Sequence, residues 1–210
     1  MQKLFSVISL FFLLLVPAMV DADNPASRVL ILGDSLSAAH NIPVALSWPE
    51  LFSTNIRSSF PHASIINASI SGETTYGGLQ RLENLFIKHK PTHLIIELGG
   101  NDGLRGLNFK QTTENLNQMV RQALNQNISV LLIGVRMPPN LGIAYNQRFQ
   151  QIFETVSSKH SITYLPNFLE GVAASDASLM QADGIHPTVK AQPILADKVL
   201  SVILEMLETN

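Results

Sequence analysis

The 210-residue chain contains no cysteine, one tryptophan and few charged side chains. Without cysteine it can form no disulfide, thiolate nucleophile, iron–sulfur site, lipidated N-terminal cysteine or cysteine-based zinc site. Charged residues make up 14% of the chain, below the roughly 25% of average soluble domains, and 46% are hydrophobic. This composition excludes disorder of the whole chain. Fourteen basic and sixteen acidic residues give a formal charge of -2, so we expect no nucleic-acid partner, which would need a basic face.

An apolar run occupies the N-terminus. Lys3 is the only charged residue before Asp21, Pro17 interrupts the run, and Val20 and Ala22 offer small side chains at a cleavage site. The run only reaches the lower limit of the about 17–25 residues that span a bilayer. A cleaved export signal is therefore favoured over a retained membrane anchor. The sequence predicts a signal peptide at residues 1–22, a single mature domain at residues 23–210, and no stable membrane anchor after cleavage.

Five apolar runs of strand length follow, at residues 28–33, 64–68, 93–98, 129–135 and 161–165. Runs without polar alternation indicate strands buried on both faces, as in parallel sheets. Helical patterns separate them, and Ser47 with Glu50 matches a capping box that would open a helix ending near Ser58. The order predicts an α/β protein, a three-layer α/β/α sandwich of flavodoxin-like type with a five-stranded, mostly parallel sheet.

Polar, glycine-rich segments interrupt this pattern at four places. Three of them follow predicted strands, and the fourth precedes the last predicted helix: Gly33-Asp34-Ser35-Leu36-Ser37, Ser69-Ile70-Ser71-Gly72-Glu73, Gly99-Gly100-Asn101-Asp102-Gly103 and Asp183-Gly184-Ile185-His186-Pro187. In an open parallel sheet, ligands bind beyond the carboxyl ends of the strands. We therefore expect these four segments to meet at one rim of the sheet.

The residue types in these segments suit nucleophilic acyl transfer. The Ser35 hydroxyl needs a base to attack a carbonyl at neutral pH, and His186 can supply one. Asp183, three residues before His186, can orient the imidazole and stabilise its charged form. The backbone N–H groups of Ser35 and Gly72 and the side-chain amide of Asn101 can donate to the developing oxyanion.

Each of these residues also has a structural interpretation. A serine after a strand is usually a helix cap, and the turn preferences of aspartate favour structural roles for Asp34 and Asp102. The remaining histidines are interpreted as structural residues: His40, His62, His89, His93 and His160. The joint occurrence of four segments in the right order favours catalysis.

Four motifs in the chain resemble those of one enzyme family, the SGNH or GDSL hydrolases. The matching segments are Gly33-Asp34-Ser35-Leu36, Ser71-Gly72, Gly100-Asn101-Asp102 and Asp183-Gly184-Ile185-His186-Pro187. The flanking sequences are similar to the bacterial periplasmic thioesterases and lysophospholipases of that family, and the resemblance runs from about Arg28 to the last predicted helix. It departs at Ala39-His40, where the family has a glycine and then an aromatic residue.

This resemblance implies an SGNH-type fold and hydrolysis of fatty acyl esters and thioesters, such as lysophospholipids and acyl-CoA, through an acyl-enzyme on Ser35. It implies a triad of Ser35, Asp183 and His186 and no metal or organic cofactor. An acyl pocket is expected beside a mobile loop at residues 103–108, with the following lining: Leu104, Leu107, Arg136, Met137 and Pro138. The resemblance also implies a periplasmic or secreted location, and we expect a monomer.

Three other functions are compatible with the same residues. A carbohydrate or short-chain acetyl esterase would use the same triad with a smaller or more polar pocket. A non-catalytic binding module would carry a degenerate site, which the intact set of catalytic residue types disfavours. A metal-dependent phosphohydrolase would use the carboxylates and imidazole of these segments as ligands, namely Asp34, Asp102, Asp183 and His186.

Overall fold

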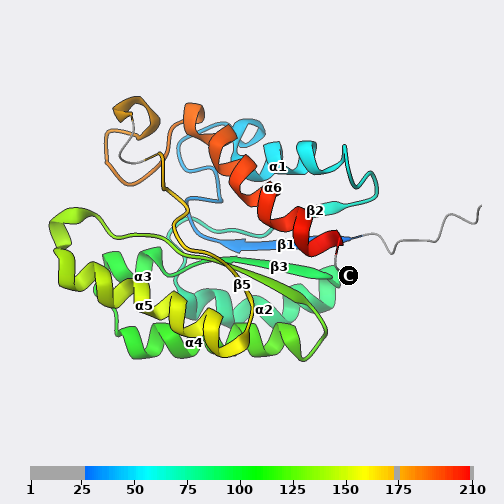
Figure 1. Ribbon diagram of the computed structural model, residues 1–210, viewed down its shortest axis with the longest axis horizontal. Helices are drawn as coiled ribbons and strands as arrows, with labels where there is room; N and C mark the ends of the chain where they lie inside the picture. The colour runs from blue at the N-terminus through cyan, green and yellow to red at the C-terminus, as the bar shows by residue number, and fades with distance from the viewer. Residues whose placement is uncertain (1–26, 173–175, 209–210) are drawn as a thin grey trace, which may run out of the picture.

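A central parallel sheet lies between two layers of helices in the computed structural model of the protein, which describes residues 27–172 and 176–208 (Figure 1). The strands are β1 (Arg28–Gly33), β2 (Ser64–Asn67), β3 (His93–Glu97), β4 (Ser129–Ile133) and β5 (Thr163–Leu165). Their order in the sheet is β2-β1-β3-β4-β5, and every neighbouring pair is parallel. The predicted α/β/α sandwich with a five-stranded parallel sheet of flavodoxin-like order is confirmed.

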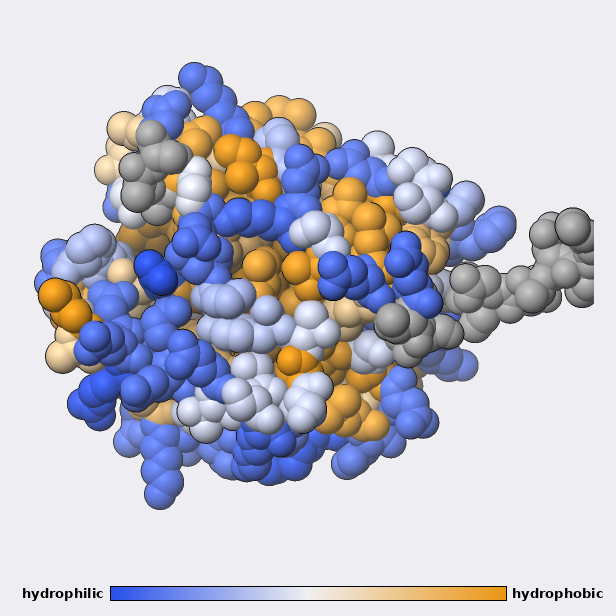
Figure 2. Space-filling model, viewed as in Figure 1, coloured by the Kyte–Doolittle hydropathy of each residue, from blue (hydrophilic) through white to orange (hydrophobic). Residues whose placement is uncertain are grey.

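Helices cover both faces of the sheet. They are α1 (Trp48–Ile56), α2 (Thr75–His89), α3 (Gly100–Leu104), α4 (Phe109–Leu124), α5 (Ile143–His160) and α6 (Gln192–Glu208), with short 3₁₀ turns at η1 (Val44–Leu46), η2 (Pro139–Leu141), η3 (Ala177–Leu179) and η4 (Val189–Ala191). Helices α1 and α6 pack together on one face, and α2, α4 and α5 on the other (Figure 1). Figure 2 shows hydrophobic side chains reaching the surface over α6 and mainly hydrophilic ones over α4 and α5. The surface over α6 is therefore more hydrophobic than the surface over α4 and α5.

The strands differ in how deeply they are buried. Every residue of β3 and residues 29–33 of β1 are buried, whereas β2, at the sheet edge, is only partly covered. The apolar runs thus correctly indicated strands covered on both faces for β1, β3 and β4, whereas β2 and β5 lie at the sheet edges and are less buried than predicted. Strand β5 begins at Thr163 rather than at the predicted residue 161, because Ser161 ends α5 in the left-handed conformation, with φ 51°.

The capping box predicted for α1 is wrong. The helix begins at Trp48, but the Ser47 side chain caps no backbone N–H and donates to the carbonyl of Val44 at 2.7 Å. The backbone N–H of Trp48 instead donates to Gln192 Oε1 at 2.9 Å, from the start of α6. A tertiary contact therefore satisfies the helix end, and the helix ends at Ile56, before the expected Ser58.

The predicted signal peptide at residues 1–22 lies outside the described residues. Across residues 27–172 and 176–208, no helix is long and apolar enough to cross a membrane. The signal peptide and the boundaries of the mature domain stay predictions.

Candidate active site

Ser35 lies just beyond the carboxyl end of β1, where the strand order changes between β1 and β3. The turn that carries it is tight, since a side chain on Gly33 would place a Cβ 2.7 Å from Ser37 Oγ and 2.9 Å from a carboxylate oxygen of Glu97. The backbone N–H of Leu36 donates to Asp34 Oδ1 at 3.1 Å. Glycine and aspartate therefore fix a turn that leaves Ser35 partly exposed between buried neighbours.

The structure brings Ser35 together with the histidine predicted far along the chain. His186 Nε2 lies 2.8 Å from Ser35 Oγ, and His186 Nδ1 lies 2.7 Å from Asp183 Oδ2. The other carboxylate oxygen of Asp183 accepts hydrogen bonds from the backbone N–H groups of Ile185 and His186 at 2.9 and 3.0 Å. The three predicted side chains thus form one continuous hydrogen-bond chain.

Electrostatics fix the proton positions in this chain. Burial raises the pKa of Asp183, but the hydrogen bonds from the backbone and ring of His186 and from the backbone of Ile185 outweigh it and lower the pKa to about 2. Asp183 is therefore anionic at neutral pH and accepts a hydrogen bond from Nδ1–H of the imidazole. His186 Nε2 is then left to accept the hydrogen bond of the Ser35 hydroxyl.

Gly72 and Asn101 line the same cavity as Ser35 and His186. Asn101 lies in the first turn of α3, and its side-chain amide donates to Asp34 Oδ2 at 3.0 Å. Gly72 adopts φ 80°, a left-handed conformation that favours glycine. One amide hydrogen of Asn101 is thus held by Asp34, which leaves the second available to a ligand.

The two aspartates interpreted as structural residues differ in their surroundings. Asp34 holds its own turn and joins it to Asn101, and burial raises its pKa to about 6 against the opposing hydrogen bonds from Leu36 and Asn101. Asp102 accepts from the backbone and hydroxyl of Thr75, at 2.9 and 2.5 Å, and from the hydroxyl of Thr112 at 3.2 Å. Asp102 therefore connects α2, α3 and α4, whereas Asp34 connects the Ser35 turn to Asn101 within the site.

Glu97, which sequence reasoning did not single out, lies under the Ser35 turn at the end of β3. It is fully buried; its Oε2 accepts from Ser37 Oγ at 2.7 Å and from the backbone N–H of Asp34 at 3.4 Å, and its Oε1 has no partner among the described residues. Burial, and then the negative charge of Asp34, raise the pKa of Glu97 well above its usual value. The signal available in the sequence was a single acidic residue inside an otherwise apolar strand.

His40 was interpreted as a structural residue, and the structure instead places it at the site. Its ring stacks against that of His186, with 4.2 Å between the centroids and 35° between the planes. Ala39, the residue before it, adopts the left-handed conformation with φ 59°, which a glycine adopts more readily than an alanine. The departure of Ala39-His40 from the family motif was the signal that pointed here.

The cavity in front of Ser35 has a volume of about 700 Å³. Four of the five predicted acyl-pocket residues line it, namely Leu104, Arg136, Met137 and Pro138, whereas Leu107 is not among the lining residues. Pro139, the next residue of the same segment, also lines the cavity, and further apolar lining that was not predicted comes from Leu36, Val135, Leu169, Met180 and Ile185. The loop expected to move is fastened to the Gly72 segment, because Arg105 Nη2 donates to the carbonyl of Gly72 at 2.9 Å.

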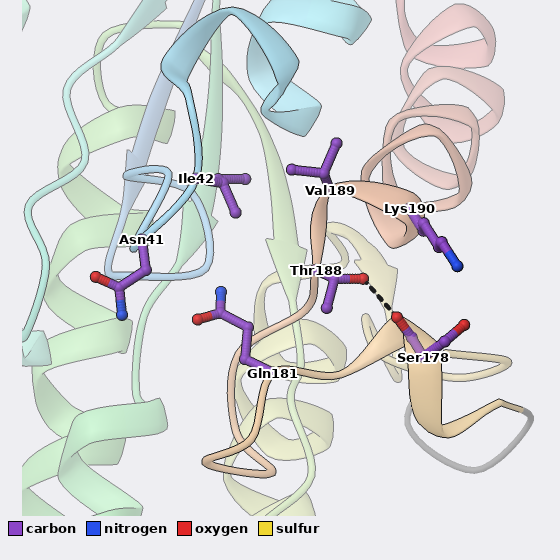
Figure 3. Close-up of a pocket in the computed structure, with 7 residues that line it drawn as sticks. All are labelled: Asn41, Ile42, Ser178, Gln181, Thr188, Val189 and Lys190. Atoms are coloured by element: carbon purple, nitrogen blue, oxygen red, sulfur yellow. Dashed lines mark hydrogen bonds between the residues drawn. The ribbon is translucent and has the colours of Figure 1, made fainter.

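A second hollow, of about 380 Å³, lies beside this site (Figure 3). Its walls are Asn41, Ile42, Ser178, Gln181, Thr188, Val189 and Lys190. Gln181 Nε2 donates to the carbonyls of His40 and Pro187, both at 3.0 Å. These bonds tie the turn after Ser35 to the loop that carries Asp183 and His186, so the hollow borders the site without containing the predicted catalytic residues.

Comparison with known proteins identifies the family. The model of the GDSL-like Lipase/Acylhydrolase family matches residues 31–192. The chain is 40% identical to the Esterase TesA of Pseudomonas aeruginosa over 87% of its own length and 90% of that protein. It is 41% identical to the Thioesterase 1/protease 1/lysophospholipase L1 of Escherichia coli over 82% and 81% of the two chains.

A solved structure titled TesA superposes on the chain with a TM-score of 0.83 at 40% identity, covering 86% of this chain and 99% of the other. The sequence match, the structural match and the arrangement of the four motifs agree with one another. The chain belongs to the GDSL-like lipase/acylhydrolase family and is an ester hydrolase.

Proposed function

We propose that this protein hydrolyses fatty acyl esters and thioesters through an acyl-enzyme formed on Ser35. The observation that carries the proposal is the hydrogen-bond chain from Asp183 through His186 to the Ser35 hydroxyl. That hydroxyl faces a cavity whose lining is rich in aliphatic side chains and methionine. A serine–histidine–aspartate chain activates a hydroxyl for acyl transfer, and an apolar cavity suits a hydrocarbon chain.

Acylation begins as Ser35 Oγ attacks the substrate carbonyl and His186 Nε2 takes the hydroxyl proton. The new C–O bond gives a tetrahedral intermediate, which collapses as the bond to the leaving oxygen or sulfur breaks. The leaving group takes the proton from His186, and the acyl group stays on Ser35. Asp183 remains anionic throughout, orients the ring and stabilises its transient positive charge.

Deacylation repeats the sequence with water as the nucleophile. His186 takes a proton from water, the resulting hydroxide attacks the acyl-enzyme carbonyl, and the proton returns to Ser35 Oγ as the free acid leaves. In both halves the oxyanion accepts hydrogen bonds from the backbone N–H groups of Ser35 and Gly72 and from the second amide hydrogen of Asn101. The bond from Asn101 to Asp34 supports this role, because it fixes the amide before substrate arrives.

The cavity favours long acyl groups over acetyl. Its volume of about 700 Å³ and its lining by Leu104, Met137, Leu169 and Met180 provide far more apolar contact than an acetyl group could use. The named activities of the two relatives, an esterase and a thioesterase/lysophospholipase, support ester and thioester substrates. A carbohydrate or short-chain acetyl esterase is therefore not favoured.

We also infer that the chain is exported, with cleavage of a signal peptide at residues 1–22, and that it acts as a monomer on small-molecule lipid or acyl ester substrates. A leader whose apolar run barely reaches the length of a membrane span supports export with cleavage. Measuring the mass of the protein recovered from the periplasm and from the medium tests the cleavage site. A mass that includes residues 1–22 contradicts it.

A chain-length series tests the substrate proposal. We would measure kcat/KM of residues 23–210 on nitrophenyl esters from acetyl to palmitoyl, with a lysophospholipid and an acyl-CoA alongside. We expect kcat/KM to rise from acetyl to medium and long chains. Burying each added methylene contributes about 0.8 kcal/mol of favourable free energy until the cavity is filled. A maximum at acetyl would contradict the acyl-pocket assignment and favour the short-chain alternative.

A further inference from the structure

We propose that His40, Asp183 and His186 together form a site for a divalent transition-metal cation such as Zn²⁺, and that the bound cation inhibits the hydrolase. One ligand atom from each residue lies within 4.8 Å of the other two. The sequence motifs indicated Asp183 and His186 as metal ligands only in the alternative of a phosphohydrolase, and His40 was interpreted as a structural residue. The inhibition rests on the proposed function, whereas the binding does not.

The position of His40 is fixed independently of any ligand. Its ring stacks on that of His186, its carbonyl accepts from Gln181 Nε2 at 3.0 Å, and Asn41 Nδ2 lies 3.1 Å from its Nε2. The residues on either side, Ala39 and Asn41, both adopt left-handed conformations. These contacts hold the second imidazole against the catalytic one, on a turn that is partly exposed and open to ions.

The donor set suits zinc rather than magnesium or calcium. Two imidazoles with one carboxylate are a zinc-binding set seen in catalytic sites, and imidazole also binds copper and nickel. Asp183 supplies the carboxylate ligand, and its Oδ2 already lies 2.7 Å from His186 Nδ1. Zinc bonds of about 2.0–2.2 Å require the three ligand atoms to draw together from their present separations of up to 4.8 Å. Rotation about the side-chain bonds of His40, which is partly exposed, can supply this movement while the backbone contacts of the turn are kept.

Metal binding at this site is incompatible with base catalysis. A cation on His186 Nε2 occupies the lone pair that accepts the Ser35 proton, and a cation on Nδ1 displaces the proton shared with Asp183. Either way the imidazole can no longer act as the general base. Magnesium and calcium prefer oxygen ligands, so they should leave the rate unchanged.

The activity test compares His40→Phe with wild-type enzyme, both free of affinity tags. Phenylalanine keeps a ring on His186 but removes the ligand atom. We expect zinc to inhibit the wild type reversibly, with a chelator restoring the rate. We expect His40→Phe to raise the half-inhibitory zinc concentration at least about tenfold, because losing even a residue that only hydrogen-bonds to a metal ligand lowers metal affinity about 10–100-fold. Each rate is expressed relative to that variant's own zinc-free rate, because His40 lines the cavity.

The control is His62→Phe, which removes an exposed histidine elsewhere on the surface. It should leave the half-inhibitory zinc concentration unchanged. Equal sensitivity of His40→Phe and wild type, or no inhibition of the wild type by zinc, would overturn the proposal.

Direct binding separates this proposal from the proposed function. Ser35→Ala lacks the nucleophile but retains all three ligands, so calorimetric titration with zinc should give one ion per chain. In the Ser35→Ala background, His40→Phe should weaken that binding at least about tenfold. Stoichiometric binding to Ser35→Ala, together with a wild-type protein that hydrolyses no acyl ester or thioester, would refute the proposed function and leave the site standing. Absence of binding to Ser35→Ala would refute the site whatever the activity.

Discussion

Glu97 accepts a hydrogen bond from the Ser37 hydroxyl at 2.7 Å, beneath the turn that carries Ser35. The carboxyl group comes from the end of β3 and the hydroxyl from the turn after β1. Glu97 is fully buried, and burial, followed by the negative charge of Asp34, raises its pKa well above the usual value. The Ser35 turn therefore rests on a carboxyl group whose burial favours the neutral form.

The first prediction concerns the pH dependence of stability through Glu97. Below its ordinary pKa of 4.5, the carboxyl is protonated in both the folded and the unfolded chain. As the pH rises above that value, the unfolded chain releases the proton while the folded chain keeps it, so Glu97 lowers the free energy of unfolding until its folded-state pKa is passed. Glu97→Gln removes this loss, and we expect the variant to gain stability relative to wild type as the pH rises from 4.5 towards neutrality.

Urea unfolding of both proteins across this range measures the difference. Glu83→Gln, at an exposed glutamate of α2, is the control and should follow the wild type. A difference between Glu97→Gln and wild type that stays constant with pH would show that Glu97 is ionised in the folded protein.

Ser35→Ala should lower kcat by about 10⁵–10⁶-fold, as removal of a catalytic serine does in a triad enzyme. The fold should persist, because the Ser35 side chain contacts His186 at the rim of the cavity rather than the core. Ester hydrolysis and circular dichroism of the same preparation test both statements. Residual activity near the wild-type rate in a folded sample would exclude Ser35 as the nucleophile.

Asn101→Ala should lower kcat by about 10²–10³-fold, the loss expected when one oxyanion donor is removed. KM should change little, since the interaction strengthens in the transition state. The variant also deprives Asp34 of its 3.0 Å donor, so its thermal midpoint must be measured beside its kinetics. A wild-type kcat would remove the amide from the oxyanion hole.

Asp183→Asn should slow acylation by up to about 10⁴-fold, because an amide at this position favours the wrong imidazole tautomer. The Asp183 oxygen that accepts from the backbone of Ile185 and His186 can be replaced by the amide oxygen, so the turn should survive. Single-turnover kinetics with an activated ester isolate the acylation step. Acylation at the wild-type rate would show that Asp183 does not orient His186.

Much of the fold could be predicted because the buried strands are continuous apolar runs, a signal that depends on local sequence alone. Helix α3 escaped, since five residues rich in glycine carry no helical stripe. The capping at Ser47 was predicted wrongly because the backbone N–H of Trp48 finds Gln192, on a helix far along the chain. A local motif cannot reveal such a partner.

For the site too, features that depend on local sequence could be predicted, and features that depend on tertiary contacts could not. Ser35, Gly72, Asn101, Asp183 and His186 could be predicted as site residues because each lies in a short motif. His40 and Glu97 were missed, because their importance comes from contacts between distant segments: a ring stacked on His186 and a carboxyl under the Ser35 turn. Leu107 was assigned to the pocket from its position in a loop, and the pocket lining does not include it.

Replacing Asp102 tests whether the aspartate of the motif Gly100-Asn101-Asp102 is structural or catalytic. Its carboxylate accepts three hydrogen bonds, two from Thr75 and one from Thr112, and is buried. Hydrogen bonds to charged groups contribute about 1.5–3 kcal/mol each, so Asp102→Ala should lower the free energy of unfolding by about 3 kcal/mol or more.

Below its unfolding transition the variant should keep a kcat within about tenfold of wild type, because Asp102 does not line the catalytic cavity. Denaturant unfolding and kinetics at low temperature measure the two effects separately. A loss of kcat as large as that of Asn101→Ala, in a sample shown to be folded, would make Asp102 part of the catalytic machinery and contradict its assignment as the joint between α2, α3 and α4.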